Sequence, residues 1–390
     1  MTGAGLATIV VAAAASLFTA WVIGAGSSGS TPFAPAVGAN AISVMRAGFY
    51  VGILGFAGAV LQGANVSEAI GAELIHGVSL SPLAATVALT TGATLVAIGV
   101  FTGYPIATAF TITGAVVGVG LAMGGDPAWA KYRQIATLWV GVPFVGGGIA
   151  FGTARTLRDT DRVRLTVPAL AALVGIVLAN VRFELLGPAE SSRSIAGAAA
   201  HAVAGGNPLV GAGAGVAFAL AIGGIVRWDL ARSVEGAQRR FLVALGSLVA
   251  FSAGGSQVGL AVGPLLPLLG DTVPLEFVLV GGGIGLLVGS WTSAPRMIKA
   301  VSQDYSSLGP NRSIAALIPS FVIAQTAVFF GIPISFNEVV VSAIVGSGLA
   351  VGSSGVSRQK MGYTVLAWVG SLAISLVVGY GAYLTAIRLL

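Results

Sequence analysis

One carboxylate lies deep inside an apolar stretch of the sequence. Residues 331–350 read GIPISFNEVVVSAIVGSGLA, and Glu338 is the only carboxylate well inside a predicted membrane span. Because an ionisable group is costly in lipid, such a residue indicates a functional site by default. It could hold a coupling proton in an anion pathway, with Ser335 and Asn337 as neighbouring polar groups. The alternative is a structural carboxylate that is hydrogen-bonded to a helix N-terminus or to an arginine.

A related stretch occurs 228 residues earlier. Residues 103–122 read GYPIATAFTITGAVVGVGLA, and nine of the twenty positions are identical in the two copies. The prolines suit the first turn of a helix, so each copy predicts a short half-helix whose N-terminal end points into the protein. Thr108 follows the proline in the first copy. Phe110 stands where the second copy has Glu338, so the two copies do not contribute equally.

A second pair of motifs, rich in glycine, lies upstream of these copies. GAGSSGS at 24–30 and GGSQVG at 254–259 are about 230 residues apart. Glycine runs favour unwinding, and unwound backbone beside a helix N-terminus offers N–H donors that suit an oxyanion. Close packing of helices through small residues is the alternative. Taken together, the four motifs predict an anion site formed by Ser27, Ser28, Ser30, Thr108, Ser256, Gln257, Ser335 and Asn337, with Glu338 for the coupling ion.

The composition places these motifs in a membrane protein. The 390 residues are 56% hydrophobic and 8% charged, whereas soluble domains carry about 25% charged residues. About twelve segments are apolar enough to span a bilayer of ~30 Å. They are 3–23, 43–64, 81–101, 105–123, 134–153, 164–182, 207–226, 240–253, 274–295, 313–331, 333–351 and 364–387.

The distribution of charge predicts the orientation of the chain. Most of the 19 Lys and Arg residues fall in alternate loops, such as 155–164 and 227–240. The positive-inside rule then places both termini outside the cell membrane. This placement explains the net charge of +6, so nucleic acid is not an expected partner.

The paired motifs predict duplication. Seven predicted crossings separate the two copies, so the halves should have opposite orientations, as in secondary transporters with interrupted helices. We therefore expect an all-α polytopic protein of two inverted repeats with broken helices or re-entrant segments. The first repeat would span 1–155, a linker with two helices 156–238, and the second repeat 239–390.

The motifs resemble those of the PiT-type inorganic phosphate transporter family, which includes sulfate permeases. SAGGSQVGLAVGPL at 252–265 corresponds to the family's AHGANDVANAIGPL, and GIPISFNEVVVSAIVG at 331–346 to its G-x-P-[VI]-S-T-T-H segment. GAGSSGSTPFAPAVG at 24–38 and GYPIATAFTITGAVVGVG at 103–120 stand at the matching places of the first half. The resemblance covers nearly the whole chain apart from 160–235.

The departures from this family concern the coupling ion. The family's motif aspartates fall on Ser27 and Gln257, and the asparagines before them fall on Gly26 and Ser256. The resemblance implies that those groups serve the cation and phosphate sites, so their loss weighs against sodium. After the proline motif this sequence has glutamate at position 338 instead of the family's histidine. In this it resembles the sulfate-permease branch, for which the resemblance implies a proton as the coupling ion.

These observations predict a secondary transporter of a tetrahedral anion, phosphate first and sulfate second, coupled to a proton or sodium. A passive anion channel or a non-transporting membrane subunit is the alternative from another class. An enzyme is not expected, since no histidine cluster and no Gly-x-Ser-x-Gly elbow lies within a span, and there is no nucleotide-binding loop. Neither a metal nor another cofactor is expected. The sequence leaves open whether the protein is a homodimer.

Overall fold

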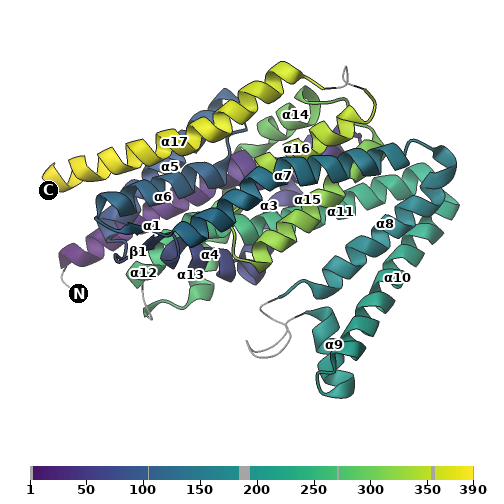
Figure 1. Cartoon of the computed structure of the whole chain (residues 1–390), viewed down its shortest axis with the longest axis horizontal. Coiled ribbons are helices and arrows are strands. Elements are labelled where there is room, and N and C mark those ends of the chain that lie inside the picture. The colour runs from purple at the N-terminus through teal and green to yellow at the C-terminus, as the bar shows by residue number, and fades with distance from the viewer. Residues whose placement is uncertain (1–2, 104, 184–193, 270–271, 353–355, 390) are drawn as a thin grey trace.

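The structure of the chain is a computed structural model that describes residues 3–103, 105–183, 194–269, 272–352 and 356–389. Almost all of the described chain is helical, as the composition predicted (Figure 1). The first part contains α1 (Gly3–Ile23), a π-helical turn (Gly24–Ser28), α2 (Ala34–Gly38), α3 (Val44–Gln62), α4 (Ala64–Ala72), α5 (Pro82–Thr102), α6 (Thr108–Ala122) and α7 (Trp129–Thr156). The middle contains α8 (Thr160–Asn180), α9 (Ile195–Ala204) and α10 (Pro208–Arg232). The last part contains α11 (Val234–Val262), a short 3₁₀ turn (Gly263–Leu265), α12 (Leu266–Leu269), α13 (Leu275–Thr292), α14 (Ala294–Asp304), α15 (Pro310–Phe329), α16 (Phe336–Leu349) and α17 (Arg358–Leu389).

Ten helices in the described ranges are long and apolar enough to cross a membrane. The two remaining predicted spans, 105–123 and 333–351, correspond to the shorter helices α6 and α16, of 15 and 14 residues. At about 1.5 Å per residue, these helices are roughly 21–23 Å long, less than the ~30 Å of the hydrocarbon core. The expectation of short half-helices at the two Gly-x-Pro motifs is therefore confirmed.

The helices of the two parts pack in matching pairs. α1 packs on α13, and α3 packs on α11. α5 and α6 form one neighbouring pair, and α15 and α16 form the corresponding pair. α6 then packs against α17, and α16 against α7, so each half-helix lies on a long helix from the other part. Two duplicated halves would produce this reciprocal pairing, although their relation by a two-fold axis remains a prediction.

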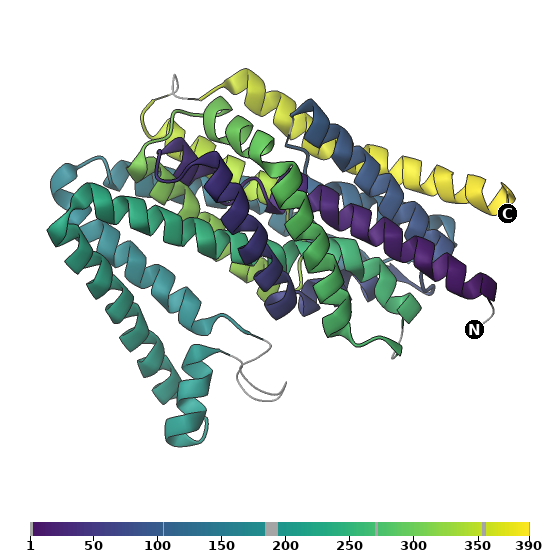
Figure 2. The same ribbon diagram turned by 180° about the vertical axis from the view of Figure 1, so that it is seen from behind.

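The middle of the chain stands beside the main bundle. α8 packs chiefly on α10, and α9 packs on α10 (Figures 1 and 2). Among the described residues, this group touches the rest of the protein mainly through α11 and α15. The boundaries 156 and 238 predicted for the linker remain predictions, but the separate packing of α8–α10 is consistent with them.

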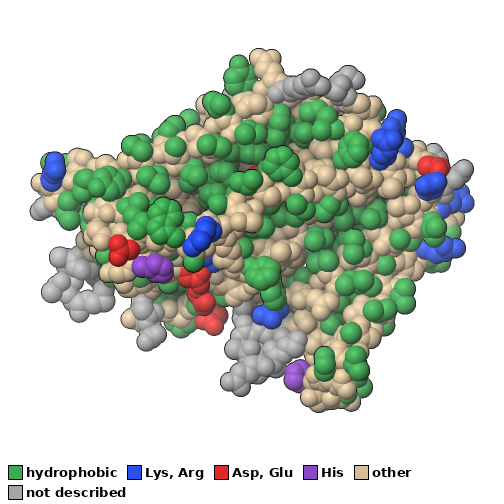
Figure 3. All heavy atoms as spheres, in the orientation of Figure 1, with side chains coloured by type: hydrophobic (Ala, Val, Ile, Leu, Met, Phe, Trp, Pro, Cys, Tyr) green, Lys and Arg blue, Asp and Glu red, His purple; other side chains and the backbone are tan. Residues whose placement is uncertain are grey.

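The two ends of the described chain lie at the same end of the bundle (Figures 1 and 2). In the view of Figure 3, hydrophobic side chains cover much of the face, and several Lys and Arg side chains gather at the opposite end. A small antiparallel pair of strands, β1 (Ile75–His76) and β2 (Asp126–Pro127), joins the loops after α4 and α6. The side of the membrane on which the termini lie remains a prediction.

The expectation that the glycine-rich motifs are unwound is wrong for 254–259, and it holds only for the end of 24–30, where residues 29–33 form turns and a bend. Residues 254–259 lie inside the continuous helix α11, and 24–28 form a π-helical turn that continues α1. The motif glycines also serve close packing: a Cβ on Gly254 would collide with the carbonyl oxygen of Gly55 on α3, and a Cβ on Gly24 with that of Leu286 on α13. Small residues let membrane helices approach at backbone distance, which was the alternative interpretation.

Candidate anion-binding site

The site is built around two places where a helix begins in the interior. Gly103 directly follows α5, and Gly331 lies two residues after the end of α15; their positive φ values of 79° and 59° suit glycine. The chain then runs extended through Pro105 or Pro333 before α6 or α16 begins. The prolines thus precede the helices and are not in their first turns, contrary to the sequence prediction.

Two tryptophans fix these extended segments. Trp139 of α7 donates from Nε1 to the carbonyl oxygen of Pro333 at 2.8 Å, and Trp368 of α17 donates from Nε1 to that of Pro105 at 2.9 Å. Trp139 also stacks on Phe110 in the first turn of α6, with ring centroids 3.9 Å apart. The segment before each half-helix is therefore held by the long helix that packs against it.

The four sequence motifs meet through two buried amides. Gln257 on α11 donates from Nε2 to Thr108 Oγ1 at 3.1 Å and to the carbonyl oxygen of Ile334 at 3.1 Å. Asn337 in the first turn of α16 donates from Nδ2 to the carbonyl oxygens of Ile106 at 2.6 Å and Gly26 at 3.1 Å. The starts of α6 and α16 and both glycine-rich motifs are thus joined in one place.

Eight buried polar atoms, all from the four motifs, have no hydrogen-bond partner among the described residues. They are Ser27 Oγ, Thr113 Oγ1, Ser256 Oγ, Gln257 Oε1, Ser335 Oγ, Asn337 Oδ1, Glu338 Oε2 and Ser342 Oγ. Each of these side chains is at most 4% exposed. Buried polar groups are normally paired, and leaving one unpaired costs about 1–3 kcal/mol. So many unpaired groups indicate a place that can bind a polar ligand.

The predicted site residues differ in how available they are. Ser27, Ser256, Ser335 and Asn337 each carry an unpaired atom. Ser28 and Ser30 are also buried, but their hydroxyls donate within the motif, to the carbonyl oxygens of Ile23 and Ser27 at 3.4 and 3.3 Å. Thr108 Oγ1 accepts from Gln257. Thr113 and Ser342 were missed by the sequence analysis, although Ser342 lies one helical turn after Glu338, a spacing that could have identified it.

Glu338 is the charged residue of this cluster. It lies in the first turn of α16 and is 1% exposed. Among the described residues, it is the only buried side chain of the Asp, Glu, Lys, Arg and His types. No salt bridge to Glu338 is found among the described residues, so of the two partners that the structural alternative offered, the helix N-terminus is the one that stays open.

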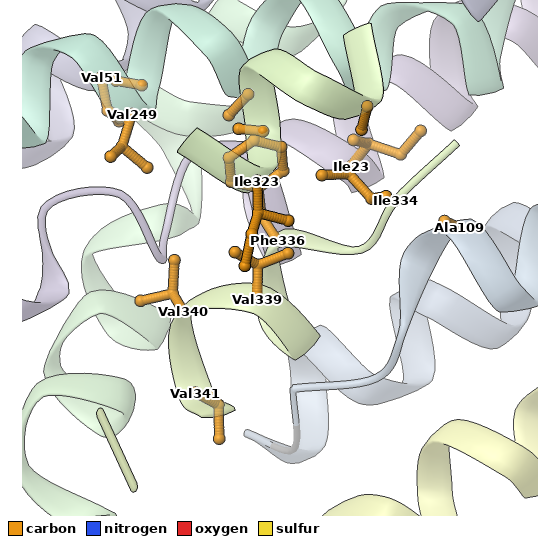
Figure 4. Close-up of a cluster of buried hydrophobic side chains, with 14 of the residues drawn as sticks. Ile23, Val51, Ala109, Val249, Ile323, Ile334, Phe336, Val339, Val340 and Val341 are labelled. Carbon is orange, nitrogen blue, oxygen red and sulfur yellow. The ribbon is translucent and has the colours of Figure 1, made fainter. Parts of the chain in front are cut away.

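The electrostatics of the cluster come from neutral groups and helix ends. α6 and α16 both begin here, and a helix N-terminus carries a partial positive charge of about half a unit and free N–H groups. The same segments contribute buried hydrophobic side chains to the core, including Ile23 at the end of α1, Ile334, and Phe336 on α16 (Figure 4). The arrangement suits a small anion held by hydroxyls, amides and N–H groups.

The fold and the enclosed polar cluster define a class of protein. An enclosed polar site beside interrupted helices, inside a bundle of membrane-spanning helices, is typical of secondary transporters. Comparison with known proteins agrees: residues 23–379 match the model of the phosphate transporter family. The chain belongs to this family.

Individual relatives cover nearly the whole chain. A protein of Thermococcus kodakarensis named "Putative phosphate permease" is 26% identical, over 92% of this chain and 93% of its own length. The chloroplastic inorganic phosphate transporter 2-1 of Arabidopsis thaliana is 24% identical, over 92% of this chain and 68% of its own. The solved structure of a sodium-dependent phosphate transporter has the same fold, with a TM-score of 0.84 and 23% identity over 98% of this chain and 100% of that one.

Proposed function

We propose that this protein carries inorganic phosphate across a cell membrane together with a cation, and that the buried cluster around Glu338 is its phosphate site. The observation that carries the proposal is the set of unpaired buried hydroxyls and amides, which lie where two half-helices begin. Membership of the phosphate transporter family supports phosphate and does not favour the sulfate alternative. An enclosed site of this kind favours a carrier over a passive channel.

The proposed coupling ion is a proton carried by Glu338. Glu338 is the only buried carboxylate among the described residues, so it is the buried side chain there that can take up and release a proton. A protonated Glu338 would donate a hydrogen bond to phosphate, whereas an ionised one would repel it. Proton and anion would then bind together. The sodium-dependent protein of the same fold makes sodium the alternative that the experiment must test.

The test is uptake of labelled phosphate into proteoliposomes that contain the purified protein. We expect phosphate to accumulate against its gradient when a proton gradient is imposed, and sulfate to be taken up poorly. Accumulation driven by sodium alone would contradict proton coupling but not phosphate transport. Single-channel phosphate currents, or no uptake under any gradient, would contradict the proposed function itself.

Ser335→Ala tests the site through a hydroxyl that has no partner in the structure. Its removal breaks no protein hydrogen bond, so the empty protein should unfold at an unchanged temperature. If the hydroxyl binds phosphate, affinity should fall about tenfold or more, since a hydrogen bond to a charged group is worth ~1.5–3 kcal/mol. Isothermal titration calorimetry measures the affinity.

The control for this variant is Ser320→Ala. Ser320 is also buried, but its hydroxyl donates to the carbonyl oxygen of Ala316 in its own helix at 2.8 Å. The control should keep the affinity of the parent protein. If Ser335→Ala keeps that affinity as well, Ser335 is not a phosphate ligand.

The absence of cysteine from the sequence allows a direct test of orientation. Arg162→Cys and Arg388→Cys each introduce one thiol at an exposed position, in the first turn of α8 and the last turn of α17. The proposed orientation, with both termini outside, predicts that a membrane-impermeant maleimide labels residue 388 in intact cells and residue 162 only after permeabilisation. The reverse pattern would invert the topology.

A further inference from the structure

A groove runs along the surface between α7 and α15, apart from the polar cluster. Its volume is about 750 Å³, which lies within the ~300–1,000 Å³ of typical ligand pockets. Both helices are candidate membrane spans, so this groove opens at membrane depth. Most of its length is lined by apolar side chains, among them Val142, Val145, Ile149, Val322, Ile323 and Ile332.

One end of the groove is polar and positively charged. Arg133, Gln134 and Thr137 line it, all in the first third of α7. Arg133 is exposed, and its Nε donates to the carbonyl oxygen of Trp129 at 3.3 Å. Within the described ranges, no carboxylate forms an ion pair with Arg133. The guanidinium group is therefore available to an anionic ligand.

The aromatic residues around Arg133 place this end at the membrane surface. Trp129, at the start of α7, is 66% exposed and makes an edge contact with Tyr132. Phe330, which follows α15, lines the same end of the groove and is 55% exposed. Exposed tryptophan and tyrosine are typical of the headgroup level of a bilayer. The apolar part of the groove then extends from that level towards the middle of the membrane.

We propose that this groove binds an anionic phospholipid, with an acyl chain between α7 and α15 and the headgroup phosphate on Arg133. The ligand must be apolar over most of its length and negatively charged at the end that meets the interface, which describes such a lipid. A second copy of this chain fits less well. If a two-fold axis passed through the groove, the two grooves would face each other and bring two arginines together without a countercharge.

The groove touches the segment that carries half of the phosphate site. Ile332 is part of its wall and is 5% exposed. The next residue is Pro333, whose carbonyl oxygen accepts a hydrogen bond from Trp139 of α7. The carbonyl oxygen of Ile334, one residue further on, accepts a hydrogen bond from Gln257. A lipid packed against α7 and Ile332 would stabilise this arrangement. Lipid binding itself does not depend on the proposed function, but this consequence does.

Gly141 allows the groove to be filled by mutation. It lines the groove, and a Cβ added to it would have no neighbouring atom within 4 Å. Gly141→Leu should therefore place a side chain where the acyl chain lies, without disturbing the fold. Gly148 lies on the same helix, also has open space, and is not part of the groove, so Gly148→Leu is the matched control.

The experiment is native mass spectrometry of the full chain in detergent, with phosphatidylglycerol or phosphatidylcholine added and thermal unfolding measured in parallel. We expect the parent protein to bind phosphatidylglycerol in preference and to unfold at a higher temperature with it. Arg133→Gln should lose about fivefold in that preference, the effect expected for one basic residue at a lipid surface. Gly141→Leu should bind neither phosphatidylglycerol nor phosphatidylcholine, whereas Gly148→Leu and Arg388→Gln should bind both as the parent protein does.

The outcomes separate this proposal from the proposed function. Equal binding of phosphatidylglycerol by the parent, Arg133→Gln and Gly141→Leu would overturn the lipid site, whatever the phosphate measurements show. A shift from dimer to monomer in Gly141→Leu, without loss of lipid, would show that a second copy covers the groove. If lipid binds as expected but phosphate does not, the lipid site stands and the phosphate site falls.

Discussion

Glu338→Gln should abolish proton-driven accumulation of phosphate while leaving binding and exchange intact. Glutamine keeps the size of the side chain and resembles the protonated acid, so the cluster should still bind the anion. It cannot release a proton, so the coupling would be lost. With one proton per anion, a gradient of one pH unit supports about tenfold accumulation, and the variant should fall to a ratio near one.

The measurement compares two modes of transport in the same proteoliposomes. Exchange of labelled against unlabelled phosphate, without a gradient, reports binding and alternating access alone. Uptake under a proton gradient reports coupling. Glu276→Gln, a change at an exposed glutamate in the first turn of α13, is the control and should retain both. If Glu338→Gln still concentrates phosphate under a proton gradient alone, Glu338 is structural and another group carries the proton.

Asn337→Leu should weaken phosphate binding by about 100-fold or more and destabilise the protein. The amide joins the two parts of the site through its bonds to Gly26 and Ile106. Leucine has a similar size but no donor, so two buried carbonyl oxygens would lose their partners. Each lost hydrogen bond costs about 1–3 kcal/mol of stability. Because both bonds hold the segments around the site in place, their loss should also weaken phosphate binding.

Asn311→Leu is the matched control for this variant. Asn311 also uses an amide to join distant segments, donating to the carbonyl oxygen of Leu157 at 2.8 Å and accepting from Gln238. It should lower the unfolding temperature without changing phosphate affinity, since it is not part of the cluster. If both variants are less stable but keep the phosphate affinity of the parent protein, Asn337 stabilises the fold and does not shape a binding site.

The sequence alone was sufficient to predict the class of fold, and it singled out the residues of the proposed site. An apolar chain with few charges predicted a helical membrane protein, and the repeated Gly-x-Pro motif predicted the two short helices. Glu338 and Asn337 stood out because polar residues are rare in such segments. The matched spacing of the motifs indicated that they meet, and the bonds of Gln257 and Asn337 join them.

The conformation of the glycine-rich motifs could not be predicted from the sequence. Glycine permits both unwinding and close approach, and the choice depends on the helix packed opposite. Gly254 faces the backbone of α3, so its helix stays continuous. The roles of Trp139 and Trp368 were also hidden, because each anchors an extended segment of the other part of the chain. Such contacts are visible only after the helices are packed.

The most direct test of the central claim is a structure determined with arsenate, a tetrahedral analogue of phosphate whose anomalous scattering identifies its position. The account predicts one arsenate within hydrogen-bond distance of the hydroxyls of Ser27, Ser256 and Ser335, beside Glu338. Arsenate bound elsewhere, with these hydroxyls still unpaired, would contradict it.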